Sequence, residues 1–358
     1  MDRRRERISH FTRREPDGVD LRHLVLGGGT HPLDARALVT DVPKASDAPS
    51  APDEDRIEER VVPEGSAADR LDRAVARLFA VSRGKAMDWI AEGRVRVDGR
   101  RAAKGSQIGA GARVSVRVPP SDAPVPQPEL AIRIVHADEH IVVADKPPGM
   151  PSHPLKPQET GTAANALVGR FPELARVGPA LREGGLVHRL DGDTSGLLLA
   201  ARTDAAHTAL RAQFAARTVE KGYLALVAGE LQAGGEIAVP LAHDPQDSRR
   251  VRAASDPGWA EAHGARPALT RFEPRERRRG FTLVDVEIAT GVMHQIRAHL
   301  AFIGHPLAGD ELYGGPRLAG LSRHFLHAAR LGFAHPEGGR ALFESPIPAD
   351  LSAVLASL

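Results

Sequence analysis

The sequence of 358 residues has no cysteine, only 4% aromatic residues and no long apolar run. Without cysteine, the protein cannot form disulfides, use a thiol nucleophile, or bind zinc or an iron–sulfur cluster through thiolates. No apolar stretch approaches the roughly 18 residues that a membrane-spanning helix needs. The charged start MDRRRERISHF is not followed by the apolar segment of a secretory signal. We therefore expect a soluble cytoplasmic protein that does not enter a membrane.

Basic residues are concentrated in one short segment. Residues 61–117 contain 12 Lys and Arg against 6 Asp and Glu, whereas residues 1–60 contain 11 against 13 and the remainder contains 25 against 27. This asymmetry is typical of a module that binds a polyanion, most often nucleic acid, although a solvated basic face gives the same counts. Charge alone does not separate the two interpretations.

Residues 61–118 are predicted to form two helices and a small antiparallel sheet. Apolar residues recur at helical spacing from Leu71, and Ser82 is suited to cap a second helix. Valines alternate with polar residues on both sides of Asp98-Gly99, which is a strong hairpin-turn signal. The side chains expected to face the core from the second helix are Met87, Ile90 and Ala91.

Three stretches of this unit, RLDRAVARL, SRGKAMDWIAEGRVRVDGR and GARVSVRV, resemble the small alpha-L RNA-binding domain named after a ribosomal small-subunit protein. The resemblance implies a domain that binds structured RNA. Arginines on its open faces would hold RNA through the phosphates, and we expect Arg83, Arg94 and Arg96 to do so. A generic two-helix domain is the alternative.

The rest of the chain divides into three regions. Residues 1–60 are expected to be a flexible N-terminal extension, and the proline-rich residues 119–130 a semi-rigid linker. Residues 131–358 alternate irregularly between strand-like and helix-like segments, which predicts an α+β fold with a mainly antiparallel sheet. The strands are expected at 132–135, 141–144, 197–200, 223–227 and 283–288, and the helices at 204–217 and 294–302.

The densest polar cluster is HRLDGDTSG, residues 188–196, between two apolar runs. A loop of this composition on a rigid scaffold is a typical place for catalysis. One of its carboxylates could act as nucleophile or base. Ser195 lacks the G-x-S-x-G spacing of a nucleophile elbow, and Asp191 with Asp193 lacks the further ligands of a calcium loop. A purely structural turn remains an alternative.

The longer segment VHRLDGDTSGLLLAART resembles the signature of RNA pseudouridine synthases of the RluA type. Further segments resemble other parts of this family in the expected order: VVADKPPGMPSHP, AQFAARTVEKGYLALVAGE, TGVMHQIRAHLAFIGHPLAGDELYG and RHFLHAARLGF. The resemblance covers residues 61–350. It implies an isomerase that flips a uridine out of RNA, detaches the uracil and rejoins it to the ribose through carbon 5.

The resemblance also implies a role for each matching residue. Asp191 matches the catalytic aspartate, which attacks the ribose anomeric carbon or assists formation of a glycal. Tyr223 matches the tyrosine that stacks on the uracil and is implicated in removing the proton from carbon 5. Arg297 matches the basic residue that pairs with the aspartate, and Arg189 the arginine that fills the space left by the flipped nucleotide. Residues expected to shape the loop and contact RNA are His188, Thr194 and Ser195.

Such a reaction needs no cofactor, and the sequence has neither a G-x-x-x-x-G-K-[ST] loop nor a strand-linked G-x-G-x-x-G. We also expect no metal, because His294, His299 and His305 lack the H-E-x-x-H spacing of a zinc site. The chain departs from the family pattern at Val292-Met293, where Arg-Thr is usual, and at Asp145, where Asn is commoner.

We therefore predict an RNA pseudouridine synthase that acts on large-subunit ribosomal RNA as a monomer, without an obligate protein partner. One rival is the same enzyme acting on transfer RNA. A second is an RNA-binding protein that has lost catalysis, against which the Asp191, Tyr223 and Arg297 set argues. A third is a serine or metal hydrolase centred on Ser195 or on the histidines.

Overall fold

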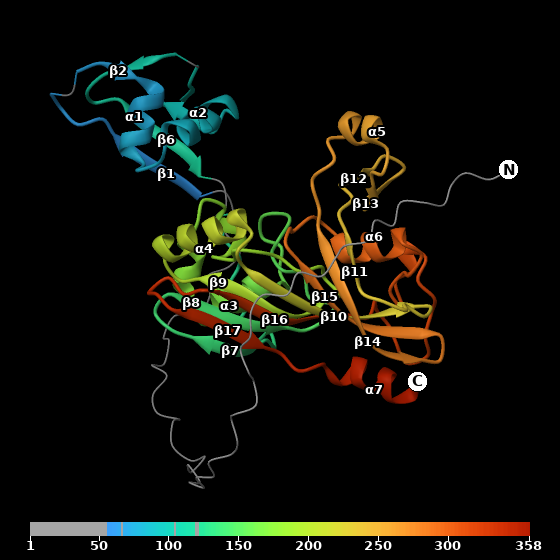
Figure 1. The fold of residues 1–358 in the computed structure, drawn as a ribbon. Helices are drawn as coiled ribbons and strands as arrows, with labels where there is room; N and C mark the ends of the chain where they lie inside the picture. The colour runs from blue at the N-terminus through green and yellow to red at the C-terminus, as the bar shows by residue number, and fades with distance from the viewer. Residues whose placement is uncertain (1–55, 66, 104, 119–121) are drawn as a thin grey trace, which may run out of the picture. The chain divides into compact units, whose positions relative to one another are not determined.

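The computed structural model describes residues 56–65, 67–103, 105–118 and 122–358 (Figure 1). The expected flexible extension lies outside the described residues over positions 1–55. Within the described part of the chain, no helix is both long and apolar enough to cross a membrane.

The small N-terminal domain packs two helices against one face of a four-stranded sheet. Its elements are β1 (Arg56–Val61), β2 (Asp69–Arg70), α1 (Leu71–Leu78), α2 (Arg83–Ala91), β3 (Val95–Val97), β4 (Arg100–Arg101), β5 (Gln107–Ile108) and β6 (Arg113–Val118). The sheet order is β1-β6-β3-β4, and β2 pairs with β5 separately. Leu71 and Val75 of α1 meet Val114 and Val116 of β6 in the core, as the helical and alternating patterns require.

The predicted details of this domain hold with one exception. The hydroxyl of Ser82 caps α2 by accepting a hydrogen bond from a backbone amide of its first turn. Asp98 and the following glycine both have positive φ and form the tight turn between β3 and β4. The predicted inward face of α2 was wrong at Met87 and Ala91, which are exposed, because Trp89 occupies the core instead.

Two domain boundaries differ from the prediction. Residues 56–60 belong to β1 rather than to the extension, because backbone pairing with β6 holds an edge strand whose apolar side chains, Ile57 and Val61, are exposed. The proline-rich residues are docked rather than free over their described part. The backbone amide of Gln127 donates to the carbonyl of Asn165 at 3.0 Å, and its side chain accepts a hydrogen bond from the amide of Gly161 at 2.6 Å.

The large domain is built on one nine-stranded sheet. Its strands are β7 (Arg133–Ala137), β8 (Ile141–Lys146), β9 (Ser195–Ala201), β10 (Glu220–Ala228), β11 (Gly235–Ile237), β14 (Thr270–Arg278), β15 (Phe281–Ile288), β16 (Leu326–Ala334) and β17 (Arg340–Glu344). The order is β11-β14-β15-β10-β16-β9-β8-β7, with β17 paired to β16. Only β9 and β16 pair in parallel, so the predicted α+β fold with a mainly antiparallel sheet is confirmed.

Helices pack on this sheet through alternating strand residues. They are α3 (Ala163–Arg170), α4 (Asp204–Ala216), α6 (Gln295–Phe302) and α7 (Ala349–Ser357). The remaining helix, α5 (Pro257–Ala262), has no buried residue. Short 3-10 turns are η1 (Pro172–Arg176), η2 (Leu181–Glu183) and η3 (Glu311–Tyr313). Val142 and Ala144 of β8 face the cluster that contains α3 and α6, whereas Ile141 and Val143 face α4. This is the period of two that a strand buried on both faces requires.

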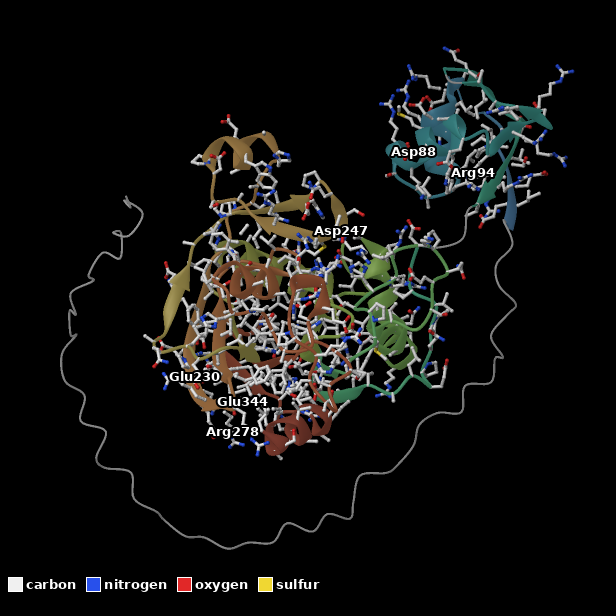
Figure 2. All side chains as sticks on the ribbon, turned by 90° about the vertical axis from the view of Figure 1, so that its right-hand side faces the viewer. Asp88, Arg94, Glu230, Asp247, Arg278 and Glu344 are labelled. Atoms are coloured by element: carbon white, nitrogen blue, oxygen red, sulfur yellow. The ribbon has the colours of Figure 1, made fainter. Side chains whose placement is uncertain are left out.

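A hairpin of β12 (Leu241–Asp244) and β13 (Asp247–Ala253), followed by α5, extends from the sheet between β11 and β14 (Figure 1). Asp247, the first residue of β13, is labelled in Figure 2. Each strand-like and helix-like segment predicted for the large domain matches an observed element to within a few residues. The elements that were not predicted are α3, β11, the β12–β13 hairpin, α5, β14, β16, β17 and α7.

Candidate active site

The polar loop singled out in the sequence leads directly into β9, a central and fully buried strand. Asp191 lies at its bend, where its carbonyl accepts a hydrogen bond from the amide of Thr194 at 3.1 Å. The side chain of Asp191 is 21% exposed. The carboxylate is thus presented at the end of a rigid strand that is paired on both sides.

Two buried side chains fasten this loop to the segment that follows β8. The hydroxyl of Ser152 donates to the carbonyl of Leu190 at 2.7 Å and accepts from its amide at 2.9 Å. The Lys146 amine donates to three backbone carbonyls at 2.7–2.9 Å, one of them that of Gly192. Burial lowers the pKa of Lys146 to about 7, against the opposing charge of Asp191. The residues on both sides of Asp191 are therefore held by the same segment.

Arg323 holds the loop from the opposite side. Its guanidinium donates to the carbonyl of Asp193 at 2.9 Å and to the hydroxyl of Ser195 at 3.1 Å. Asp350, at the start of α7, pairs with Arg323 at 2.8 Å, and the arginine side chain is only 4% exposed. The loop is therefore fixed from two directions, and groups held in this way need little reorganisation during a reaction.

Arg297, in the first turn of α6, lies beside Asp191. Asp310 accepts two hydrogen bonds from it, from Nε at 2.6 Å and from Nη2 at 2.8 Å. The third nitrogen, Nη1, lies 3.4 Å from Oδ2 of Asp191. Burial opposes the charge of Arg297, but hydrogen bonding to Asp310 and the charges of both carboxylates outweigh it and raise the pKa of the guanidinium. A permanent positive charge therefore faces Asp191.

The start of α6 is fixed by a side chain that the sequence did not single out. His294 precedes the helix in the left-handed region, with φ of 52°. The side-chain oxygen of Gln295 accepts two hydrogen bonds. One comes from the hydroxyl of Thr290 at 2.8 Å and the other from the backbone amide of Val292 at 3.1 Å. The departure at Val292-Met293 therefore leaves the helix start in place, and Arg297 reaches Asp191.

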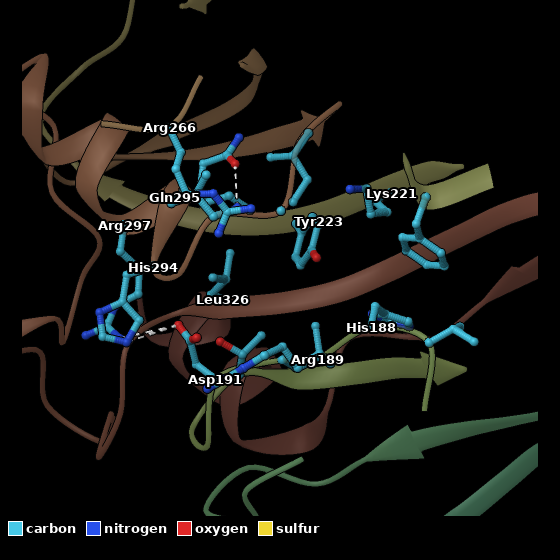
Figure 3. Close-up of a pocket in the computed structure, with 18 of the residues that line it drawn as sticks. His188, Arg189, Asp191, Lys221, Tyr223, Arg266, His294, Gln295, Arg297 and Leu326 are labelled. Carbon is cyan, nitrogen blue, oxygen red and sulfur yellow. Dashed lines mark hydrogen bonds and ion pairs between the residues drawn. The ribbon is translucent and has the colours of Figure 1, made fainter. Parts of the chain in front are cut away.

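A pocket of about 370 Å³ opens beside Asp191 (Figure 3). Tyr223, from β10, is 8% exposed and forms part of its wall. Burial and the charge of Asp191 raise the pKa of the Tyr223 hydroxyl, so that it is a neutral phenol near pH 7. Ile288, Val292 and Leu326 add apolar surface to this pocket, and its cationic residues are Arg189, Arg211, Lys221, Arg266 and Arg297.

The structure thus brings together the three residues predicted to carry the chemistry, and Arg189 is exposed at the same pocket. His188 lies inside the loop: its Nε2 accepts a hydrogen bond from the amide of Leu199 at 3.0 Å, and its ring stacks on Phe214. Burial, together with the charges of nearby Lys221 and Arg211, lowers the pKa of His188 to about 3. A neutral ring in this position shapes the loop.

Thr194 and Ser195 also shape the loop, but they are each 2% exposed. Thr194 bonds to His324 at 2.8 Å, and Ser195 to His327 at 3.0 Å. These bonds support the expected role of both residues in shaping the loop. Thr194 also lines the pocket beside Asp191, and contact of the two hydroxyls with RNA stays a prediction. The burial of Ser195 leaves the hydrolase alternative without an accessible serine nucleophile.

The predicted arginines of the small domain separate into two groups. Arg94 and Arg96 line a groove of about 620 Å³ on the open face of its sheet, together with Arg101 and Arg117. Arg94 is labelled in Figure 2. Arg83 lies elsewhere, at the start of α2, where its Nε donates to the buried carboxylate of Asp72 at 2.6 Å.

Sequence reasoning missed the residues that hold the site together, chiefly Asp310, Arg323 and Gln295. Asp310 lies within LAGDELYG and Arg323 opens RHFLHAARLGF, both segments in which the family resemblance had been noticed. That proximity was the only available signal, because a buried carboxylate or guanidinium has no period or spacing of its own.

Residues 140–302 match the family described as RNA pseudouridylate synthase, and residues 69–114 match the S4 domain. The chain is 36% identical over 329 residues to a protein of Xanthomonas campestris named "Ribosomal large subunit pseudouridine synthase D", covering 87% of this chain and 96% of that protein. It is 36% identical over 328 residues to a protein of the same name from Nitrosomonas europaea, covering 88% and 92%.

A solved structure gives the same result for the large domain. "Human RNA Pseudouridylate Synthase Domain Containing 1" aligns with a TM-score of 0.50 and 26% sequence identity, covering 63% of this chain and 87% of the human one.

Proposed function

Because the chain belongs to the RNA pseudouridine synthase family, we propose that it isomerises specific uridines of large-subunit ribosomal RNA. The enzyme is an isomerase that acts on RNA. The choice of RNA is supported by the relatives from Xanthomonas and Nitrosomonas, whose names specify the large ribosomal subunit. Transfer RNA remains the rival substrate.

The observation that carries this function is the position of Asp191 at a pocket shared with Tyr223 and Arg297. Isomerisation breaks the bond between the ribose anomeric carbon and N1 of uracil and forms a bond to carbon 5, whose proton is lost while N1 gains one. No atom enters or leaves overall, so neither a redox cofactor nor a nucleotide is needed. Whether it attacks the sugar or assists glycal formation, Asp191 acts as an anion, which the adjacent Arg297 stabilises.

The pocket has the chemistry that a flipped nucleotide requires. Extrusion of a base costs a few kcal/mol, and stacking on an aromatic ring recovers roughly 1–3 kcal/mol. We propose that Tyr223 stacks on the flipped uracil. Arg189, which is exposed at the pocket, would fill the space that this nucleotide leaves in the RNA. The further cations Arg211 and Arg266 suit the phosphates on either side of the target.

The small domain is proposed to supply affinity rather than chemistry. Arg94 and Arg96 lie in a groove with two further arginines, an arrangement suited to successive phosphates. Arg83 is 56% exposed although it is bonded to Asp72, and it is retained as a third contact. None of these side chains lines the pocket that contains Asp191.

The test uses the purified full-length protein with unmodified transcripts of large-subunit ribosomal RNA and of total transfer RNA. Pseudouridines are mapped at nucleotide resolution after incubation without added cofactor. We expect new pseudouridine in the ribosomal transcript. Modification confined to transfer RNA would overturn the choice of substrate, and no modification of either would overturn the proposed activity.

The matched variants are Asp191→Asn and Asp193→Asn, which remove one negative charge each from the same loop. Asp191→Asn is expected to abolish turnover while RNA affinity stays within a few fold, because its carboxylate faces the pocket. Asp193 is exposed and does not line the pocket, so Asp193→Asn should retain turnover. Near-normal turnover of Asp191→Asn would contradict the assignment of the catalytic aspartate.

A further inference from the structure

Tyr313 contacts both groups that face the Asp191 carboxylate, Arg297 and His294. The guanidinium of Arg297 lies over the Tyr313 ring, with Cζ 5.1 Å from the ring centroid. The Tyr313 hydroxyl lies 3.2 Å from Nδ1 of His294, and Nε2 of the same imidazole is 3.8 Å from Oδ2 of Asp191. One side chain therefore touches the two donors that surround Asp191.

The hydroxyl of Tyr313 is in turn fixed by the β12–β13 hairpin. The backbone amide of Val251, in β13, donates to this oxygen at 2.9 Å. Arg250 fastens the same strand: its Nε donates to Asp244 within the hairpin at 2.8 Å, and its Nη1 to the carbonyl of Leu312 at 3.4 Å. The hairpin and the segment that contains Tyr313 are therefore seated against each other by two polar contacts.

These contacts favour one of the two neutral tautomers of His294. The Tyr313 oxygen accepts from the Val251 amide, so its own proton can be donated to Nδ1 of His294. The neutral imidazole then carries its hydrogen on Nε2, which points toward Asp191. The opposite tautomer would turn a nitrogen lone pair toward a carboxylate, which is electrostatically unfavourable. Tyr313 thus favours the tautomer that presents a donor to Asp191.

From this arrangement we propose that Tyr313 is a positioning residue of the reaction: held by β13, it fixes the tautomer of His294 and the orientation of Arg297, and through them the donors around Asp191. The inference rests on the proposed function, because it concerns the carboxylate that carries the isomerisation. It adds a structural requirement, namely that the hairpin must be seated for the site to be complete.

The departure at Val292-Met293 supports the same inference independently. These two residues pack in one apolar cluster with Tyr313, Leu241 and Val251. Val292 and Met293 give the hairpin apolar contacts beside the polar contacts of Tyr313. At these two positions the family resemblance predicts an arginine and a threonine. The hairpin is therefore attached to the residues just before α6 as well as to the segment around Tyr313.

The first test is a double-mutant cycle on the full-length protein at saturating ribosomal RNA. Tyr313→Phe keeps the ring under Arg297 and removes the hydroxyl. We expect the single-turnover rate to fall roughly three- to tenfold, the worth of one net hydrogen bond, while the dissociation constant for RNA stays within about twofold. In a His294→Gln background the same substitution should have little further effect, because this background lacks the imidazole whose tautomer Tyr313 is proposed to fix.

The second test loosens the hairpin without touching Tyr313. Arg250→Gln removes the contacts to Asp244 and to the carbonyl of Leu312, and should reproduce the loss of rate. The matched control is Arg249→Gln, at the position next to Arg250. Arg249 is exposed, and within the part of the chain that the structure describes its side chain bonds only to Asp247, at the start of β13. Hydrogen exchange of residues 247–253 should rise in Arg250→Gln and in Tyr313→Phe, and stay unchanged in the control.

A third measurement needs no substrate. Nitrogen chemical shifts of the wild-type imidazoles should show His294 protonated on Nε2, and Tyr313→Phe should shift this proton toward Nδ1. The inference would be overturned by an Nδ1-protonated His294 in the wild type, by additive effects in the cycle, or by an unchanged rate in Tyr313→Phe. Because the tautomer and hydrogen exchange are measured without RNA, they stand even if the proposed ribosomal substrate is wrong.

Discussion

Asp310 accepts hydrogen bonds from two nitrogens of the Arg297 guanidinium, Nε and Nη2, and so directs the third nitrogen, Nη1, toward Asp191. The Asp310 side chain is 1% exposed and that of Arg297 is 9% exposed. A planar fork held in this way has one orientation only. The charge that faces Asp191 is therefore set by a residue that does not line the pocket.

Asp310→Asn is expected to lower turnover by roughly a hundredfold, the size of effect that a displacement of about 1 Å produces at a reacting group. It should also destabilise the fold by about 3–5 kcal/mol, because a buried guanidinium loses its partner. The measurements are single-turnover rates and urea unfolding. The control is Glu311→Gln, whose exposed carboxylate pairs with Arg317. Equal effects of the two variants would refute the role of Asp310.

Tyr223→Phe tests the hydroxyl separately from the ring. The ring should keep its stacking, so RNA affinity should survive. Turnover should fall by roughly the 10²–10⁴-fold typical of acid–base groups. Because the pKa of Tyr223 is raised, its side chain is not a phenolate near pH 7. The neutral hydroxyl must therefore release its own proton when it accepts the proton from carbon 5. If single-turnover rates of Tyr223→Phe match the wild type, Tyr223 serves only for stacking, and Tyr223→Leu should then weaken binding.

The residues proposed to carry the chemistry could be singled out in the sequence because each stands in a segment that resembles the family. Asp191 and Arg297 are 106 residues apart in the sequence and meet across the site, and Tyr223 lines the same pocket. Each of the three stands in a recognisable stretch. The residues that hold them could not be predicted. Asp310 and Arg323 look like ordinary surface charges in the sequence, and only the fold reveals that both are buried.

The fold shows the same division between local and tertiary signals. β9 was predicted because its residues are apolar throughout, which suits a strand buried on both faces. β14 was missed because residues 275–278 in its second half are charged and exposed, so that pairing with β15 alone defines this half of the strand. Met87 was assigned inward by helical spacing, but the larger Trp89 fills the space available beneath α2.

The groove of the small domain can be tested by the salt dependence of binding. Arg94→Gln/Arg96→Gln in the full-length protein should reduce the slope of log affinity against log salt by roughly 0.7–0.9 for each lost phosphate contact. Turnover at saturating RNA should persist. The control is Arg73→Gln/Arg77→Gln on α1, whose arginines pair with Asp69 outside the groove. An unaltered slope in the groove variant would show that this face is not the RNA clamp.

Acid should weaken the protein through His324, which lies against the loop that carries Asp191. This imidazole is 5% exposed, and burial with the nearby charges of Arg297 and Arg323 lowers its pKa to about 2. Because the folded state then binds fewer protons than the unfolded state, stability is lost as the pH falls below the unfolded value near 6.5, and the loss grows until about pH 2.

At pH 5.5 this single histidine should cost the wild type about 1 kcal/mol relative to pH 7.5. His324→Gln can still bond to Thr194 and cannot titrate, so its free energy of unfolding should fall by correspondingly less between these two pH values. Urea unfolding of the variant, the wild type and a His243→Gln control, which alters an exposed histidine of the hairpin, measures the difference. If His324→Gln and the wild type lose the same stability, His324 is protonated in the folded protein at pH 5.5, and its bond to Thr194 does not depend on a neutral ring.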